Sequence, residues 1–206
     1  FAFTKRAKPV FYPSQDNQKI HEWPGGVEDP RIVETEEGLY VLTYTQWNRK
    51  VPKLAVATSR DLVNWQKHGP VFQHYRDGMY HNAETKSGAI VTQIKDGRLV
   101  AAKINGKYWM YYGVPHVWLA SSNNLIDWEP VENYEGKLAP VLSPRPGYFD
   151  SWLVEAGPPP LLTDKGIVVL YNAGNSQNIG VKALGNRVYT GGQALFDSNE
   201  PWKLID

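Results

Sequence analysis

The 206-residue sequence contains no cysteine, and neither sign of charge is in excess, because 22 Lys and Arg balance 21 Asp and Glu to a formal net charge of +1. The lack of cysteine excludes disulfide bonds, thiolate metal ligands and cysteine nucleophiles. The balanced charge gives no electrostatic reason to expect nucleic acid or an acidic membrane surface as a partner. No run approaches the roughly 18 apolar residues of a membrane span, so we expect none.

A signal-peptide pattern is also missing at the start, where the first residue is Phe1 and not Met. We therefore expect a processed product or a piece of a longer protein. The sequence carries no targeting signal that would decide its compartment.

Aromatic residues, glycine and proline are abundant: the aromatic content is 13%, with eight Trp, twelve Tyr, 18 Gly and 15 Pro. This mixture favours many short strands and turns, and no long amphipathic pattern indicates a helix. Aromatic rings stack on the flat apolar faces of sugars, but all-β cores are also aromatic. Both roles therefore stay open for any single ring.

An internal repeat organises the chain. Residues 54–65 align without a gap on residues 117–128, at a constant offset of 63 positions. The repeat predicts strands that open with glycine at 38–44, 106–112 and 166–171, and closing strands at 69–72 and 139–142, with 8–11 resembling a further closing strand. Four short antiparallel strands per unit fit the blade of a β-propeller. A β-sandwich with a coincidental internal match is the alternative.

The predicted fold class is therefore all-β, with a β-propeller of which the chain covers about three blades, the first and the last incomplete. A propeller needs about four or more blades to close. We expect residues 1–206 to form a single β-propeller catalytic domain that is incomplete at both ends.

Three segments between the predicted blades, residues 23–31, 74–83 and 147–160, are expected to converge at one end of the central channel. The first contains Glu28, Asp29 and Arg31 beside Pro30, and Arg31 is expected to hold an acid in its ionised form. An Asp before Pro is also a common turn former, so a purely structural role for Asp29 stays open.

The second segment offers Tyr80, His81 and Asn82 as hydrogen-bond partners for substrate hydroxyls. His74 and His81 lack a further ligand at metal-binding spacing, so we expect no metal site and no cofactor. The third segment places Glu155 in an apolar run, where a partly desolvated carboxylate suits acid–base work, with a structural ion pair as the alternative.

Together these motifs resemble a known family. The series GGVEDPRI, LAVATSRDLVNW, KINGKYWMYYG, WLASSNNLIDWE, FDSWLVEAGPPPLLTDKGIVVLYNA and YTGGQALFD, from about residue 23 to residue 197, is similar to the signature of glycoside hydrolase family 130. The resemblance implies a five-bladed propeller that acts as a β-mannoside phosphorylase or as a β-1,2-mannosidase. Members of the family are longer at both ends.

By this resemblance, Asp29 matches the catalytic acid, which in the phosphorylases is thought to protonate the leaving oxygen through a mannose hydroxyl. Phosphorylases also need cations for phosphate, and Arg49 after Asn48 and Lys103 match two of them. Their His-Arg pair is missing here, where the chain reads Tyr-Tyr-Gly at 111–113, and Glu155 stands where phosphorylases have a small residue.

A second acid at the point of attack repels phosphate and can deprotonate water instead. We therefore predict an inverting β-mannosidase, with β-1,2 as the candidate linkage, Asp29 on the acid side and Glu155 as the base, the two carboxyls roughly 6.5–9.5 Å apart. The predicted substrate contacts come from Glu28, Arg31, Asn48, Arg49, Tyr80, His81, Asn82, Lys103, His116 and Asp150.

Two other functions stay open. One is a β-mannoside phosphorylase that releases mannose 1-phosphate, and the other is a carbohydrate-binding propeller without catalysis. The expected partner is a mannoside oligosaccharide, with inorganic phosphate only for a phosphorylase. A hydrolase of this type would be periplasmic or secreted and a phosphorylase cytoplasmic, while the oligomeric state stays open.

Overall fold

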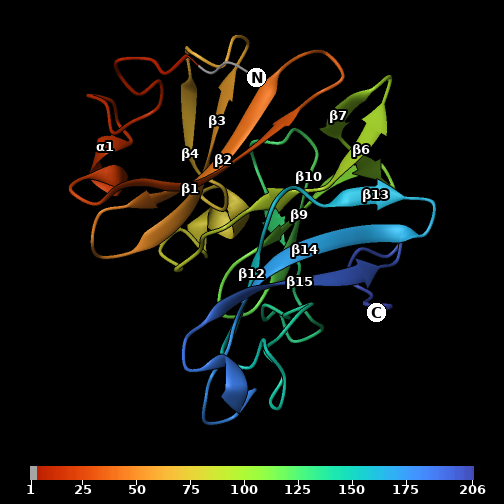
Figure 1. The fold of residues 1–206 in the computed structure, drawn as a ribbon. Coiled ribbons are helices and arrows are strands. Elements are labelled where there is room, and N and C mark those ends of the chain that lie inside the picture. Colours follow the sequence, from red (N-terminus) through yellow and green to blue (C-terminus); the bar gives the residue numbers. More distant parts are fainter. Residues whose placement is uncertain (1–3) are drawn as a thin grey trace.

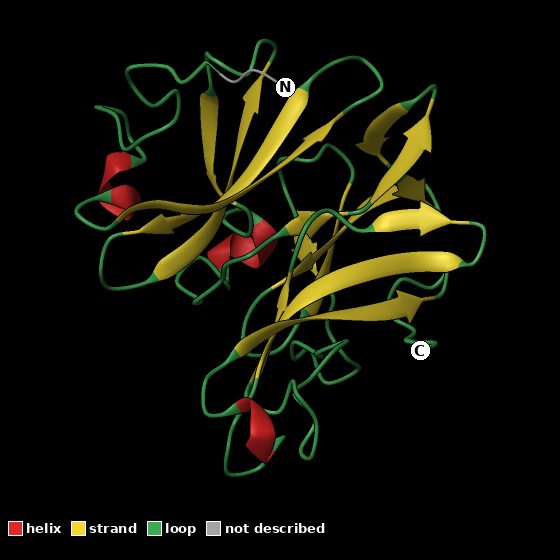
Figure 2. Ribbon diagram, viewed as in Figure 1, coloured by secondary structure: helices red, strands yellow, loops and turns green. Residues whose placement is uncertain are grey.

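The computed structural model describes residues 4–206, and Figures 1 and 2 show that nearly all of its regular structure is β. Its helical elements are short: α1 (Lys19–Glu22), η1 (Tyr75–Gly78) and η2 (Lys182–Leu184). The prediction of an all-β fold is confirmed. No helix within residues 4–206 has the length and apolar character needed to cross a membrane.

The first sheet is a complete antiparallel meander. Its strands lie in chain order: β1 (Gly26–Glu34), β2 (Tyr40–Trp47), β3 (Pro52–Ser59) and β4 (Gln66–Pro70). β1 begins earlier than expected, inside the segment 23–31 that the sequence pattern marks as a loop. Residues 8–11 form no strand, and Phe11 instead packs edge-on against Tyr44 at 4.7 Å and Trp65 at 5.9 Å.

The second sheet repeats this order from the inner strand outward: β5 (Ala89–Ile90), β9 (Lys107–Tyr112), β10 (Trp118–Ser122) and β11 (Glu129–Pro130), with β8 (Lys103–Ile104) beside β9. The two copies of the repeat occupy the same place, since β3 and β10 are each the third strand. Each is followed by the same turn, in which the hydroxyl of Ser59 or Ser122 accepts a hydrogen bond from a main-chain N–H three residues on.

The third sheet is only partly built. Its strands are β12 (Leu153–Ala156), β13 (Leu161–Thr163), β14 (Gly166–Gly174) and β15 (Tyr189–Phe196). The central strand is β14, which pairs with β12 and β13 along one edge and with β15 along the other. A hairpin joins this sheet to the first one: β6 (Thr92–Lys95) and β7 (Arg98–Ala101). Each link is a single parallel residue pair, Leu161 with Thr92 and Glu34 with Val100.

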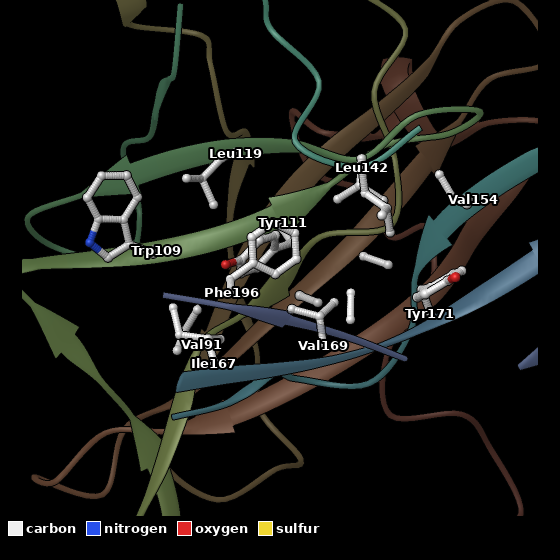
Figure 3. Packing of buried hydrophobic residues seen from close by; sticks show 14 of the residues in the cluster. Val91, Trp109, Tyr111, Leu119, Leu142, Val154, Ile167, Val169, Tyr171 and Phe196 are labelled. Atoms are coloured by element: carbon white, nitrogen blue, oxygen red, sulfur yellow. The ribbon is translucent and has the colours of Figure 1, made fainter. Parts of the chain in front are cut away.

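The core lies between successive sheets, as it does between propeller blades. One cluster packs the first sheet against the second and includes Val33, Val56 and Met110. A second cluster packs the second sheet against the third (Figure 3), where the rings of Tyr111 and Phe196 lie 4.9 Å apart. Burying each such side chain contributes about 1.5–3 kcal/mol, so face-to-face packing of the sheets fixes the positions of their inner strands.

Candidate functional site

The inner strands bring three charged side chains together. Asp29 lies on β1, Lys86 lies three residues before β5, and Glu155 lies on β12. Lys86 Nζ is 3.3 Å from Asp29 Oδ2 and 3.7 Å from Glu155 Oε1. The two carboxylate oxygens can be no farther apart than the sum of these distances, about 7 Å. The structure thus brings together the two acids that the sequence analysis selected.

Asp29 occupies an irregular position in β1. The register with β2 shifts between Glu28 and Arg31, and Asp29 has a φ of 51°, in the left-handed region. Pro30 follows and has no N–H to donate to the strand ladder. This combination interrupts the pairing of β1 and turns the Asp29 carboxylate toward Lys86.

Arg31 fixes this bulge against the third sheet. Its guanidinium donates to the main-chain oxygens of Asp29 at 2.9 Å, Ala156 at 2.5 Å and Gly157 at 2.5 Å. Burial lowers the pKa of Arg31, while the negative charges of Asp29 and Glu155 oppose that change. Arg31 therefore acts on the two acids through its charge and through the backbone, because its hydrogen bonds go to carbonyl oxygens.

Lys86 is the basic residue that lies between Asp29 and Glu155. Burial alone would lower the pKa of Lys86, but the charges of Asp29, Glu155 and Glu28 outweigh it and raise the pKa. Lys86 therefore stays protonated at neutral pH and stabilises negative charge on both acids. The Glu155 side chain is 12% exposed and that of Asp29 is 35% exposed, while the Oδ2 atom of Asp29 that faces Lys86 is itself shielded from solvent.

Ser87 also belongs to the site, since its hydroxyl donates a hydrogen bond to Glu155 Oε1. Asn172 of β14 lies opposite Glu155 and lines, with Asp29 and Gly157, an open hollow of about 310 Å³. Sequence reasoning missed Lys86, Ser87 and Asn172. The usable signal was position, because Lys86 and Ser87 come three and four residues after the predicted segment 74–83 and lead into the inner strand β5.

The remaining predicted contacts of the first sheet lie outside this cluster. Glu28 lines an apolar hollow with Val27 and Trp65. Asn48 Oδ1 accepts hydrogen bonds at 3.0 Å from the N–H groups of Lys50 and Val51, as a turn former does. Arg49 is exposed, has a φ of 63° and forms no ion pair within the described chain, residues 4–206.

The predicted contacts of segment 74–83 form a separate group. The Tyr80 hydroxyl donates to Glu132 at 2.9 Å, and burial together with Glu132 raises the pKa of Tyr80 to about 12. His81 Nε2 and Asn82 Oδ1 lie 3.4 Å and 3.3 Å from Lys53 Nζ. Burial and the charge of Lys53 lower the pKa of His81.

Lys103 was expected to contact the substrate, but it does not reach the carboxylates of Asp29 and Glu155. Its Nζ lies 5.0 Å from the ring centre of Tyr108, and its charge acts on Glu37, in the turn that follows β1. Asp29 lies near the other end of β1, and a strand rises about 3.3 Å per residue. The lysine at the carboxylates is Lys86 and not Lys103.

His116 lies in the loop between β9 and β10, and Asp150 lies in the loop that leads to β12. His116 Nδ1 is 2.9 Å from Ser143 Oγ, and the carbonyl of the neighbouring Pro115 accepts the Val154 N–H at 3.0 Å. Asp150 is fully buried and accepts hydrogen bonds from Arg145 at 2.9 Å and Tyr171 at 3.0 Å. No group of three or more His, Asp or Glu among residues 4–206 is arranged to hold a metal ion.

Two carboxylates within about 7 Å of each other, with a lysine between them, can move protons to and from a bound molecule. One carboxyl can serve the leaving group and the other can serve the attacking group. The upper limit of their separation reaches the lower end of the roughly 6.5–9.5 Å range of inverting glycosidases.

Comparison with known proteins identifies the family. The family model of glycoside hydrolase family 130, described as beta-1,4-mannooligosaccharide phosphorylase, matches residues 1–205. A curated relative, the 1,2-beta-oligomannan phosphorylase of Thermoanaerobacter sp. (strain X514), is 30% identical over 98% of this chain and 56% of its own length. The chain thus spans about half the length of the curated relatives that it matches.

Solved structures are more similar. A glycosyl hydrolase from Bacteroides ovatus superposes with a TM-score of 0.95 at 55% identity, over 96% of this chain and 56% of that one. A second structure also superposes with a TM-score of 0.95 at 55% identity, and the match covers 96% of this chain and 55% of that one. Its description reads that the GH130 family of mannoside phosphorylases contains glycoside hydrolases that target beta-1,2 mannosidic linkages in Candida mannan.

These structures have the five-bladed β-propeller fold of the family, and the three sheets described above correspond to blades of it. Because the family model covers nearly the whole sequence, the chain belongs to glycoside hydrolase family 130.

Proposed function

We propose that the protein containing this chain hydrolyses β-mannosidic bonds, with β-1,2 as the linkage, and inverts the anomeric centre. Asp29 serves the leaving-group side, and Glu155 removes a proton from the attacking water. The observation that carries this proposal is the position of Glu155, which lies 3.7 Å from the ammonium group that also holds Asp29 at 3.3 Å.

The two carboxylates favour water over phosphate as the attacking group. Lys86 and Arg31 offset their charge, but three N–H groups of Arg31 are already bonded to carbonyl oxygens and are not free to bind phosphate. A phosphate dianion would approach two carboxylates at short range, where like charges repel strongly. A neutral water molecule meets no such barrier and can donate its proton to Glu155.

Phosphorolysis is the second candidate, because the curated relative from Thermoanaerobacter is a phosphorylase. Lys86 is a cation at the site, and Lys and Arg are the usual ligands of phosphate. In that reaction phosphate would take the place of water as the nucleophile, and the products would be mannose 1-phosphate and a shortened mannoside.

The products separate the two reactions. The full-length protein is incubated with β-1,2-mannobiose, with and without inorganic phosphate, and mannose and mannose 1-phosphate are quantified. Hydrolysis requires mannose release that does not depend on phosphate. Formation of mannose 1-phosphate with no reaction in phosphate-free buffer would overturn the proposal in favour of phosphorolysis.

Substitution of the two acids tests their assignment. Glu155→Gln should lower kcat by about 100-fold or more while sugar binding persists, because the amide cannot accept the proton from water. Asp29→Asn should cause an equally severe loss. The control is Glu129→Gln, which removes an exposed carboxylate paired with Lys107 and should leave kcat unchanged. Unchanged turnover in Glu155→Gln removes Glu155 from the mechanism, and a protein that binds sugar without any turnover is a binding module.

A further inference from the structure

Ser87 is held in a conformation that its residue type rarely adopts. Its φ is 56°, in the left-handed region that favours glycine and asparagine, and the residue is fully buried. A strained conformation of this kind persists only where the surrounding structure enforces it, and it is common at functional sites. Among residues 4–206, the one hydrogen bond of the Ser87 side chain goes to Glu155, which comes from a different sheet.

Both neighbours of Ser87 are pinned by main-chain hydrogen bonds. The carbonyl of Lys86 accepts the Gly113 N–H at 2.8 Å, and the carbonyl of Gly88 accepts the Thr43 hydroxyl at 2.6 Å. Gly88 itself has no room for a side chain, because an added Cβ would lie 2.7 Å from Met110 Sδ. The hydroxyl of Ser87 is therefore fixed by the first and second sheets and is presented to the third.

This contact makes the two oxygens of Glu155 unequal. Oε1 accepts the Ser87 hydroxyl and faces Lys86 at 3.7 Å. Oε2 accepts no hydrogen bond from residues 4–206, and it is not among the polar atoms shielded from solvent. Oε2 is therefore the unbonded oxygen of Glu155, and it keeps contact with solvent.

We propose that Ser87 is a positioning residue that fixes the rotamer of Glu155 and reserves Oε2 for the attacking water; this inference rests on the hydrolysis proposed above. Oε2 takes one proton of the water while the water oxygen bonds to the anomeric carbon. The bond from that carbon to the leaving oxygen breaks with its electron pair, and that oxygen receives a proton from the Asp29 side. Ser87 itself exchanges no proton, because its hydroxyl stays bonded to Oε1.

Three substitutions separate the hydroxyl from the strained backbone. Ser87→Ala removes the hydroxyl and keeps the strain, Ser87→Gly removes both, and Ser87→Cys keeps a weaker donor of similar size. We expect kcat on β-1,2-mannobiose to fall about 10- to 100-fold in the Ala and Gly variants, with KM within about 3-fold of wild type. Ser87→Cys should be intermediate.

The outcomes separate this inference from the proposed hydrolysis. If wild type hydrolyses mannobiose and Ser87→Ala keeps its kcat, or if Ser87→Gly is as active as wild type while Ser87→Ala is not, the hydroxyl has no positioning role. A crystal structure of Ser87→Ala gives an answer that does not depend on the reaction catalysed. A carboxylate of Glu155 that turns away from its wild-type position supports the inference, and an unmoved carboxylate overturns it.

Discussion

The imidazole rings of His21 and His81 lie 5.8 Å apart, edge to face, and Lys53 lies beside His81. Burial lowers the pKa of His21 and of His81, and the charge of Lys53 lowers both further. The folded protein thus holds these rings neutral, while the unfolded chain takes up protons near the ordinary value of 6.5. Their contribution to stability is present above pH 6.5 and is lost as pH falls through the lowered pKa values.

We therefore expect His81→Gln to flatten the fall in the free energy of unfolding between pH 7 and pH 5. Glutamine keeps an acceptor for Lys53 but does not titrate. Denaturant unfolding at pH 7, 6 and 5 measures the effect, and His74→Gln is the matched control because His74 is exposed. An unchanged slope in His81→Gln would contradict this account.

Only some of the site residues could be identified from the sequence. Asp29 and Glu155 could be selected because a carboxylate between Gly and Pro, or inside an apolar run, is unusual. Lys86 and Ser87 belong to no motif, and their roles depend on the packing of the second sheet between the other two. Lys103 was selected by resemblance alone, and the path of β8 carries it to the far end of β1.

Among the elements, β1 and β12 are tied together through one side chain. Arg31→Lys should lower the free energy of unfolding by about 1–3 kcal/mol, because an ammonium cannot reproduce the three hydrogen bonds of the guanidinium. Thermal or denaturant unfolding measures the loss.

Arg98→Lys provides the comparison for this variant, since Arg98 is exposed and bonds to Glu34 and to the Glu36 carbonyl at the surface. Its effect should stay within about 0.5 kcal/mol. Equal losses in the two variants would mean that Arg31 does not hold the two strands together.

The middle strands of each sheet were predictable and the inner ones were less so. The strands β2, β9 and β14 are rich in aromatic or β-branched residues, which favour strands, and β3 and β10 are the two copies of the repeat. The start of β1 and the whole of β12 lie in segments rich in Gly, Pro and acids, which read as loops. β12 has only four residues, three of them buried, so no alternation of polar and apolar residues marks it.

At the scale of the whole molecule, stability depends on contacts between sheets. Phe196 of β15 is fully buried against Tyr111 of β9. We expect Phe196→Ala to lower the free energy of unfolding by about 3–5 kcal/mol, because it leaves a cavity between the second and third sheets. Leu170→Ala on the exposed side of β14 is the control and should cost far less. A small loss in Phe196→Ala would show that the sheets do not rely on this contact.

The repeat allowed the propeller to be predicted, since the offset of 63 residues marks equivalent strands of neighbouring blades. The hairpin of β6 and β7 was not predictable, because it interrupts the second unit and belongs to no repeat. That the chain is one domain, incomplete at both ends, stays a prediction.

The same hairpin links the first and third sheets through one residue pair on each side, at the end of β1 distant from Asp29. Close to Asp29, the guanidinium of Arg31 links the same two sheets by donating to the carbonyls of Ala156 and Gly157. The spacing of the two acids is therefore held by contacts beside them as well as by the hairpin.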